Sequence, residues 1–323
     1  MTKIAKQVVN GKAFEYALLA ELNERLEHIT LVEIIKNDSF EIALKYFETF
    51  NDTKKAKFRL TASFAINFLI DIEPRLTSGI NESDILELEI VADKSGQTGD
   101  VRDVLAIRAL QKWEIGISAK NNHRAVKHSR LSSNIDFGLK WLSIPSSQNY
   151  FDEVNPIFDR LATIRQESNA TQKWGFLGDY HTSVYVPILN AFKKELLRLD
   201  NDNPGIVAQR LVEYLIGNKD YYKVIKSKSK VEIQAFNLHG TLNLPFENRR
   251  SKAKVPKLKF PDRLIEVDFH GDSKTTLIVT MNEGWQISFR IHNASSRIEP
   301  SLKFDINLLS APHSLFINKL FLP

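Results

Sequence analysis

Two acidic residues and one lysine stand at the two ends of a predicted β-hairpin. Asp100 and Asp103 come where its first strand, 101–109, begins, and Lys120 follows its second strand, 113–119. Antiparallel pairing through a short turn brings these ends together. Carboxylates that hold a divalent metal can hydrolyse a phosphodiester, because the cation polarises the phosphate and lowers the pKa of bound water. The hairpin therefore predicts a metal-dependent site for phosphodiester cleavage.

The residue types also restrict the metal. The chain has no cysteine, which excludes a zinc-thiolate site and a disulfide framework. Mg²⁺ prefers carboxylate and water oxygens, and a lysine adds positive charge where negative charge develops on the phosphate. These roles match Asp103 or Asp100, a second acid, and Lys120.

The pairing register decides which aspartate lies beside Lys120. If the numbers of paired residues sum to 221, Asp103 lies opposite Ser118 and diagonal to Lys120. If they sum to 222, Asp103 faces the core and Asp100 joins the polar face. An unpaired carboxylate in an apolar core is costly, so we expect Asp103 to be the ligand, with Asp100 as the next candidate.

Three further side chains are candidates for the same site. Glu114 shares the polar face with Lys120 but lies roughly 20 Å along the strand, and a cross-strand pair with Arg108 is the alternative. Glu15, on the flank of a predicted helix, could bring a carboxylate to the metal, or it is a solvated helix charge. His123 is open to a catalytic role or to a structural or phosphate contact.

The charge is unevenly distributed along the 323 residues, which carry a net charge of +5 and have a pI near 9.1. Residues 1–99 hold 12 basic and 16 acidic residues, whereas residues 219–263 hold 12 basic and 4 acidic. Basic charge concentrated in one region is typical of phosphate binding, and a solvated loop is the alternative.

Hydrophobic residues make up 43% of the chain, enough to bury a core. No apolar run is long enough to cross a bilayer, and no signal-peptide core is recognisable near the first residue. We therefore expect no membrane association and a cytoplasmic location.

Periodicity predicts helices first and strands later. Expected helices cover 11–29, 40–50, 53–69, 137–142, 150–165, 183–199 and 204–216. Besides the hairpin, expected strands cover 85–91, 231–244, 264–269, 275–281 and 286–292. Residues 121–131 form a basic connector, and the polar stretch 168–178 is the best candidate linker. The chain is thus expected to divide into a catalytic part, 1–170, and a helical and β-rich recognition part, 171–323.

Three stretches resemble a known family. Residues 99–103 with 113–132, the stretch 136–141, and the stretch 289–305 are similar to the HaeIII/NgoPII group of type II restriction endonucleases. The resemblance implies a PD-(D/E)xK nuclease core, an α/β (α+β) fold with a mixed sheet flanked by helices and a β-rich C-terminal DNA-binding part. It also implies Mg²⁺ as cofactor, cleavage of duplex DNA at a short GC-rich palindrome (GGCC in that group), and 5′-phosphate and 3′-hydroxyl ends.

The family's motif maps onto the hairpin with one departure. Asp103, or Asp100, takes the place of the first acid, and Lys120 that of the lysine. Ser118 stands where an Asp or Glu is usual. The second carboxylate is left open among Glu114, Glu15 and Asp136.

DNA affinity should come from Lys and Arg on phosphates, and sequence reading from Arg on guanine in the major groove. We expect the base-reading arginine to be Arg249, Arg250, Arg290 or Arg297, unless 285–310 is simply a strand pair and its cap. The full set of expected DNA-binding residues is Asn122, Arg124, Lys127, His128, Arg130, Arg249, Arg250, Lys252, Arg290, His292 and Asn293.

The expected partners follow from the resemblance. Double-stranded DNA is the substrate, and a separate DNA methyltransferase is the companion protein. A palindromic target makes a homodimer natural, while sequential nicking by a monomer is the alternative. Two other functions stay open: a structure-specific repair or recombination nuclease with the same core, and, because of Ser118, a DNA-binding regulator without catalysis.

Overall fold

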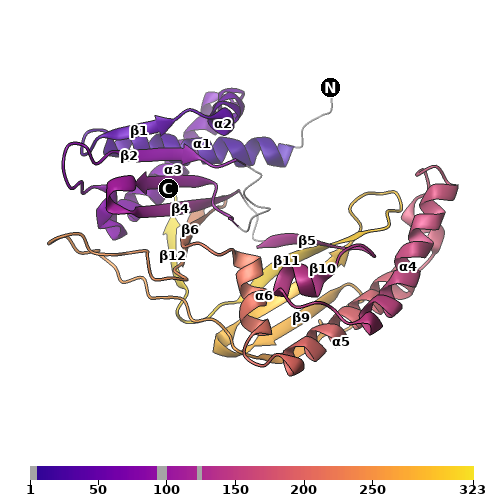
Figure 1. Ribbon diagram of the computed structural model, residues 1–323. Helices are drawn as coiled ribbons and strands as arrows, with labels where there is room; N and C mark the ends of the chain where they lie inside the picture. The colour runs from indigo at the N-terminus through magenta and orange to yellow at the C-terminus, as the bar shows by residue number, and fades with distance from the viewer. Residues whose placement is uncertain (1–5, 93–99, 122–125) are drawn as a thin grey trace. The chain divides into compact units, whose positions relative to one another are not determined.

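The computed structural model describes residues 6–92, 100–121 and 126–323 of the chain (Figure 1). The chain forms two compact units, and both are discontinuous in sequence. Unit 1 comprises 1–124, 217–258 and 314–323, and unit 2 comprises 125–216 and 259–313. This division differs from the contiguous parts expected at 1–170 and 171–323, because strands far apart in sequence pair within each unit.

Unit 1 is built on a seven-stranded sheet. Its strands, in spatial order, are β1 (Val32–Ile35), β2 (Leu86–Ile90), β3 (Val104–Arg108), β4 (Trp113–Asn121), β6 (Tyr221–Lys226), β7 (Lys230–Phe236) and β12 (Phe316–Phe321). The pairs β1–β2 and β4–β6 are parallel and the other neighbours are antiparallel. The expected mixed sheet is therefore confirmed.

Three helices cover one face of this sheet: α1 (Lys6–Leu26), α2 (Asp38–Glu48) and α3 (Asp52–Ile72). The side chains of Asn37 and Asn51 accept hydrogen bonds from the first turns of α2 and α3, which explains where these helices begin. Apolar residues from the helices and from alternate strand positions, among them Phe14 and Ile115, form one buried core. The three helices expected at 11–29, 40–50 and 53–69 are confirmed, apart from their ends.

Unit 2 is built on a five-stranded antiparallel sheet with helices. The strands, in spatial order, are β5 (Lys127–Leu131), β11 (Leu302–Ser310), β10 (Gln286–His292), β9 (Thr276–Met281) and β8 (Leu264–Phe269). The helices are α4 (Gln148–Glu167), α5 (Val186–Asp202) and α6 (Val207–Ile216), with π-helical turns at Gly138–Leu142 and His181–Tyr185. Phe192 of α5 packs its ring against Phe289 and Phe304 at 5.6 and 5.2 Å, so the aromatic core lies between helix and sheet.

Three sequence expectations about connections are wrong. The basic connector 121–131 contains strand β5, whose backbone pairs with β11. The strand expected at 231–244 ends at Phe236, and the chain continues without regular structure to 258. The expected linker 168–178 lies inside unit 2, where Trp174 is buried. Among the residues that the structure describes, no helix is long and apolar enough to cross a membrane.

Candidate active site

The β3–β4 hairpin has the register favoured from the sequence. Val104 pairs with Ile117 and Arg108 with Trp113, so the numbers of paired residues sum to 221. A turn at Ala109–Gln111 joins the strands, and Lys112 adopts a left-handed backbone with φ 48°. Trp113, with the alternate residues to Ala119, belongs to the core under the helices. The polar residues of β4 therefore lie on the opposite face.

Asp103 and Lys120 meet on that polar face. Asp103 Oδ2 lies 3.4 Å from Lys120 Nζ and accepts hydrogen bonds from the Ala119 backbone N–H at 2.6 Å and the Ser118 hydroxyl at 3.3 Å. The Asp103 and Lys120 side chains are 23% and 29% exposed, so solvent and substrate reach both. The carboxylate and ammonium that the sequence placed together are thus in contact.

The backbone fixes Asp103 from both sides. Its N–H donates to the Ile117 carbonyl at 2.8 Å, and its carbonyl accepts from Val91 N–H at 3.0 Å. These bonds extend the ladder past the last residue of β3, so the carboxylate has little freedom to move away from β4. A site whose acid is held by the sheet itself is preorganised.

Strand β6 supplies two neighbours of the site that the sequence reasoning missed. Tyr221 pairs with Gly116 and Lys223 with Ser118 across the parallel β4–β6 ladder, which places both on the polar face. Burial, and then the negative charge of Asp103, raise the pKa of the Tyr221 hydroxyl, so it stays neutral beside the carboxylate. The sequence feature that could have identified Lys223 is the interruption of the apolar run 221–226 by a charged residue.

Asp100 is less available than Asp103 as a metal ligand, because its carboxylate is paired with Arg102. Both of its oxygens accept from Arg102, from Nε at 2.9 Å and from Nη2 at 2.7 Å. Burial alone would raise the pKa of Asp100, but the hydrogen bonds from Arg102 outweigh it and hold the pKa below its usual value. Asp103, whose oxygens face Lys120, is therefore the better-placed acid.

Glu114 belongs to the same ion-pair group as Asp100. It accepts from Arg102 Nη1 at 2.9 Å and lies 3.5 Å from Lys219 Nζ. The alternative considered for Glu114, a cross-strand pair with Arg108, is wrong, because the register turns the Arg108 side chain into the core. There its guanidinium donates to three backbone carbonyls, those of Arg75, Leu76 and Asp84.

The remaining catalytic candidates differ in what the structure shows. Glu15 is buried on α1 and accepts from Lys12 Nζ at 3.1 Å, so it is not a solvated helix charge. Asp136 lies in unit 2 and accepts from Leu139 N–H and from the Ser146 hydroxyl, which fits a loop-bracing role. His123 lies outside the described residues, as do Asn122 and Arg124.

Only a partial ligand set for a metal is evident. Within residues 6–92, 100–121 and 126–323, no three or more His, Cys, Asp or Glu side chains form a group that could hold an ion. In these same ranges, every hydrogen bond to the Asp103 carboxylate goes to Oδ2, which leaves Oδ1 open to a cation. Mg²⁺ often takes one or two carboxylates together with waters and substrate phosphates. Asp103 therefore fits a one-carboxylate site completed by phosphate.

Four of the expected DNA-binding residues share one face of the five-stranded sheet. His128 of β5 and Arg290 of β10 are both paired in register with Asp305 of β11, and their side chains lie 3.3 and 3.1 Å from its carboxylate. Two residues along, Arg130 and His292 flank Lys303 in the same way.

This polar face is opposite the aromatic core of unit 2, because Phe289 and Phe304 alternate with its residues. Two of its side chains are half exposed: Arg290 is 54% exposed and His128 is 51% exposed. Lys303 was missed, since the pairing of β11 between β5 and β10 has no local sequence signal. The face offers charged side chains to a phosphate backbone or to base edges.

The other expected DNA contacts have mixed placements. Lys127 turns inward, donates to the Tyr214 carbonyl at 2.7 Å and lies over its ring, and burial lowers its pKa to about 8. Asn293 braces its own loop through Ser295. In unit 1, Arg249 donates to Thr77 and Lys252 pairs with Asp71, and both are exposed.

The comparisons with known proteins bear on the whole chain. The family model described as HaeIII restriction endonuclease matches residues 11–312. A curated relative, the type II restriction enzyme HaeIII of Haemophilus aegyptius, is 42% identical over 308 residues, which cover 95% of each chain. No solved structure matches. The resemblance inferred from the hairpin and the C-terminal stretch is confirmed, and the chain belongs to the HaeIII restriction endonuclease family.

Proposed function

We propose that this chain is a type II restriction endonuclease that hydrolyses double-stranded DNA at the Asp103–Lys120 pair. The observation that carries the assignment of the site is the 3.4 Å contact between Asp103 Oδ2 and Lys120 Nζ, on a solvent-accessible face of the sheet. Family membership supports DNA cleavage as the reaction. The hairpin provides the carboxylate and the ammonium group that this reaction would use.

Each side chain has a distinct task in this proposal. A divalent cation, Mg²⁺ in our proposal, supplies charge neutralisation at the phosphate and a lowered pKa for water. Asp103 would hold the cation. Lys120 leaves Oδ2 when the phosphate arrives and donates to the oxygen on which negative charge develops. Glu15 remains the candidate for a second carboxylate, and the products are 5′-phosphate and 3′-hydroxyl ends.

Recognition is assigned to the charged face of unit 2 and to the exposed arginines of unit 1. The target is GGCC or a similar GC-rich palindrome, for which Arg290 and Arg250 are base-reading candidates. A homodimer would match the symmetry of such a target, and a separate methyltransferase would protect the host DNA. Arg290 is supported by its pair with Asp305, which holds the guanidinium in one orientation.

The test is digestion of phage DNA with purified protein and Mg²⁺, followed by sequencing of the fragment ends. One short palindrome at every end supports the proposal. Cuts confined to forks or nicked structures would instead favour a repair nuclease.

Ser118 stands where an Asp or Glu is usual, and its register partner on β6 is a lysine, Lys223. The missing carboxylate is one specific reason to consider a DNA-binding regulator without catalysis. Tight binding to GC-rich duplexes in Mg²⁺, with no cleavage at any enzyme concentration, would favour that function.

A further inference from the structure

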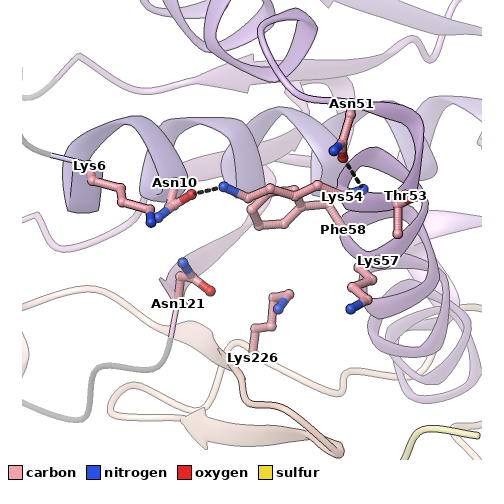
Figure 2. Close-up of a pocket in the computed structure, with 9 residues that line it drawn as sticks. All are labelled: Lys6, Asn10, Asn51, Thr53, Lys54, Lys57, Phe58, Asn121 and Lys226. Carbon is pink, nitrogen blue, oxygen red and sulfur yellow. Dashed lines mark hydrogen bonds between the residues drawn. The ribbon is translucent and has the colours of Figure 1, made fainter.

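A cavity in unit 1, separate from the Asp103–Lys120 pair, is lined by four lysines. It has a volume of about 590 Å³, and its described lining consists of Lys6, Asn10, Asn51, Thr53, Lys54, Lys57, Phe58, Asn121 and Lys226. Figure 2 shows these side chains, contributed by α1, the start of α3, and the ends of β4 and β6. We call it the lysine pocket. No carboxylate is present among these lining residues.

The lysines are held close together although they repel one another. Burial, and then the charges of Lys6 and Lys226, lower the pKa of Lys54. Burial and the charge of Lys57 lower the pKa of Lys226 in the same way. Throughout the described part of the chain, none of these four lysines has a carboxylate partner within 4.0 Å. A bound anion would reduce the repulsion among these lysines.

Contacts with neutral groups hold two of these lysines, Lys54 and Lys226. Lys54 Nζ donates to Asn10 Oδ1 at 2.6 Å and lies 3.5 Å from the centre of the Phe50 ring. Lys226 Nζ lies 5.4 Å from the centre of the Phe58 ring. The cation positions are thus set by aromatic rings and an amide, and an anion entering the pocket meets them preorganised.

The chemistry of the lining favours a sugar–phosphate backbone over a base. Phe58 forms the floor and is only 2% exposed, so it offers no ring face on which a base could stack. The side-chain NH₂ groups of Asn10, Asn51 and Asn121 can donate to phosphate and sugar oxygens. The N–H groups at the start of α3 add partial positive charge.

The pocket begins one residue beyond the catalytic lysine. Asn121 follows Lys120 on β4, with their Cα atoms ~3.8 Å apart, and its register partner on β6 is Lys226. Alternation along β4 turns Asn121 toward the helix-covered face and Lys120 toward the polar face. A strand that passes this end of β4 can therefore contact both.

We propose that the lysine pocket binds the backbone phosphates of the substrate DNA strand next to the phosphate that is cleaved. The inference rests on the proposed function and gives it a phosphate subsite that is independent of base sequence. Its occupant is a sugar–phosphate chain, and inorganic phosphate or pyrophosphate shares the same chemistry.

The test measures DNA binding without cleavage, in Ca²⁺, over a series of salt concentrations. The variants are Lys57→Gln, which changes an exposed side chain, and the double variant Lys54→Gln/Lys226→Gln. Lys45→Gln, on the exposed side of α2 and outside the pocket, is the matched control. Each lost phosphate contact should lower the slope of log K against log salt by ~0.9.

We expect Lys57→Gln to reduce the slope by about 1 and the double variant by about 2, on cognate and non-cognate duplexes alike, with Lys45→Gln unchanged. Circular dichroism and thermal unfolding check that the variants fold. If the double variant does not fold, the salt slope of Lys57→Gln alone decides the test. An unchanged slope in Lys57→Gln and in a folded double variant overturns the proposal.

A second arm separates the two sources of phosphate. Thermal unfolding is followed in inorganic phosphate or pyrophosphate, against chloride at equal ionic strength. If Lys57→Gln loses a phosphate-induced stabilisation but keeps the DNA salt slope, the pocket serves a free anion and the proposal is overturned.

These results are distinguishable from failure of the proposed function. If wild-type protein cuts DNA at one palindrome while the pocket variants bind like wild type, only the pocket inference fails. If wild-type protein binds DNA without cutting it while the variants show a smaller salt slope, DNA phosphate binding by the lysine pocket stands, and the proposed function fails together with the placement of the pocket next to a cleaved phosphate.

Discussion

Gly116 leaves the space that the side chain of Arg102 fills, since a Cβ atom on residue 116 would lie 2.0 Å from Arg102 Cδ. Arg102 lies across β4 there and joins Asp100 to Glu114. The Arg102 side chain is only 5% exposed, whereas the side chains of its partners Asp100 and Glu114 are 18% and 38% exposed. The glycine thus permits an ion-pair group at the start of the β3–β4 hairpin.

Replacing Gly116 with alanine should therefore destabilise unit 1. The added methyl group displaces Arg102 and disrupts its ion pairs with Asp100 and Glu114. Overpacking of this kind costs about 1–3 kcal/mol in the free energy of unfolding. Urea unfolding followed by circular dichroism measures the loss. Gly175→Ala is the control, because nothing lies within 4 Å of the site where its Cβ would be. Equal midpoints for the two variants would contradict the prediction.

Asp103→Asn and Lys120→Ala should each abolish cleavage while leaving DNA binding nearly intact. The first removes a negative charge that would hold the cation, and the second removes the donor to the phosphate, so each should slow cleavage by about 10²-fold or more. Single-turnover cleavage and Kd in Ca²⁺ separate the two effects.

Asp100→Asn is the comparison for these variants, because Asp100 pairs with Arg102 rather than with Lys120. It should cost stability and keep most of the cleavage rate. If Asp100→Asn cannot cut and Asp103→Asn can, the assignment of the acid is reversed.

Arg290→Gln should weaken cognate binding specifically. Its guanidinium is half exposed and oriented by Asp305, which suits a bidentate contact with guanine worth ~1–3 kcal/mol. We expect about tenfold or greater loss on the cognate duplex and no change on a non-cognate one. Arg160→Gln, exposed on α4, is the control. Equal losses on both duplexes would mean that Arg290 contacts phosphate instead.

Glu73 should make the stability of unit 1 depend on pH. It is fully buried at the end of α3, and burial raises its pKa to about 7, although Tyr222 donates to it at 2.5 Å. The folded pKa is above the unfolded value of 4.5, so the stability that Glu73 contributes is present below pH 4.5. It is lost as the pH rises to about 7, a change on the order of 3 kcal/mol.

Glu73→Gln should remove this dependence. Urea unfolding of wild type and variant at pH 5 and pH 8 gives the difference in stability at each pH. The variant should gain relative to wild type at pH 8, whereas Glu24→Gln, exposed on α1, should not. Parallel pH curves for Glu73→Gln and wild type would show that Glu73 stays ionised in the folded protein.

The β3–β4 hairpin could be predicted from sequence because its constraints are local. A single register keeps Asp103 out of the core, and that register also excludes the Glu114–Arg108 pair, since it sets Arg108 opposite Trp113. The polar alternation of β4 then fixes the side of the sheet on which Lys120 lies.

Features built by distant segments escaped the sequence reasoning. The pairing of β5 with β11 joins residues about 170 positions apart, such as Arg130 and Lys303, and no periodicity reports it. The lysine pocket combines the basic start of α3, visible as a run of lysines, with Lys226, which is far along the chain. Neither could be assigned until the sheets were known.

The parallel pairing of β4 with β6 also has a consequence during synthesis. The ladder between β4 and β6, in which Gly116 pairs with Tyr221, can form only after Tyr221 has been synthesised. At a ribosomal rate of ~5–20 residues per second, the nascent hairpin keeps one unpaired edge for roughly 5–20 s. A growing polypeptide therefore emerges with this edge of β4 unpaired, and premature termination before β6 yields a fragment without the strand that pairs with β4.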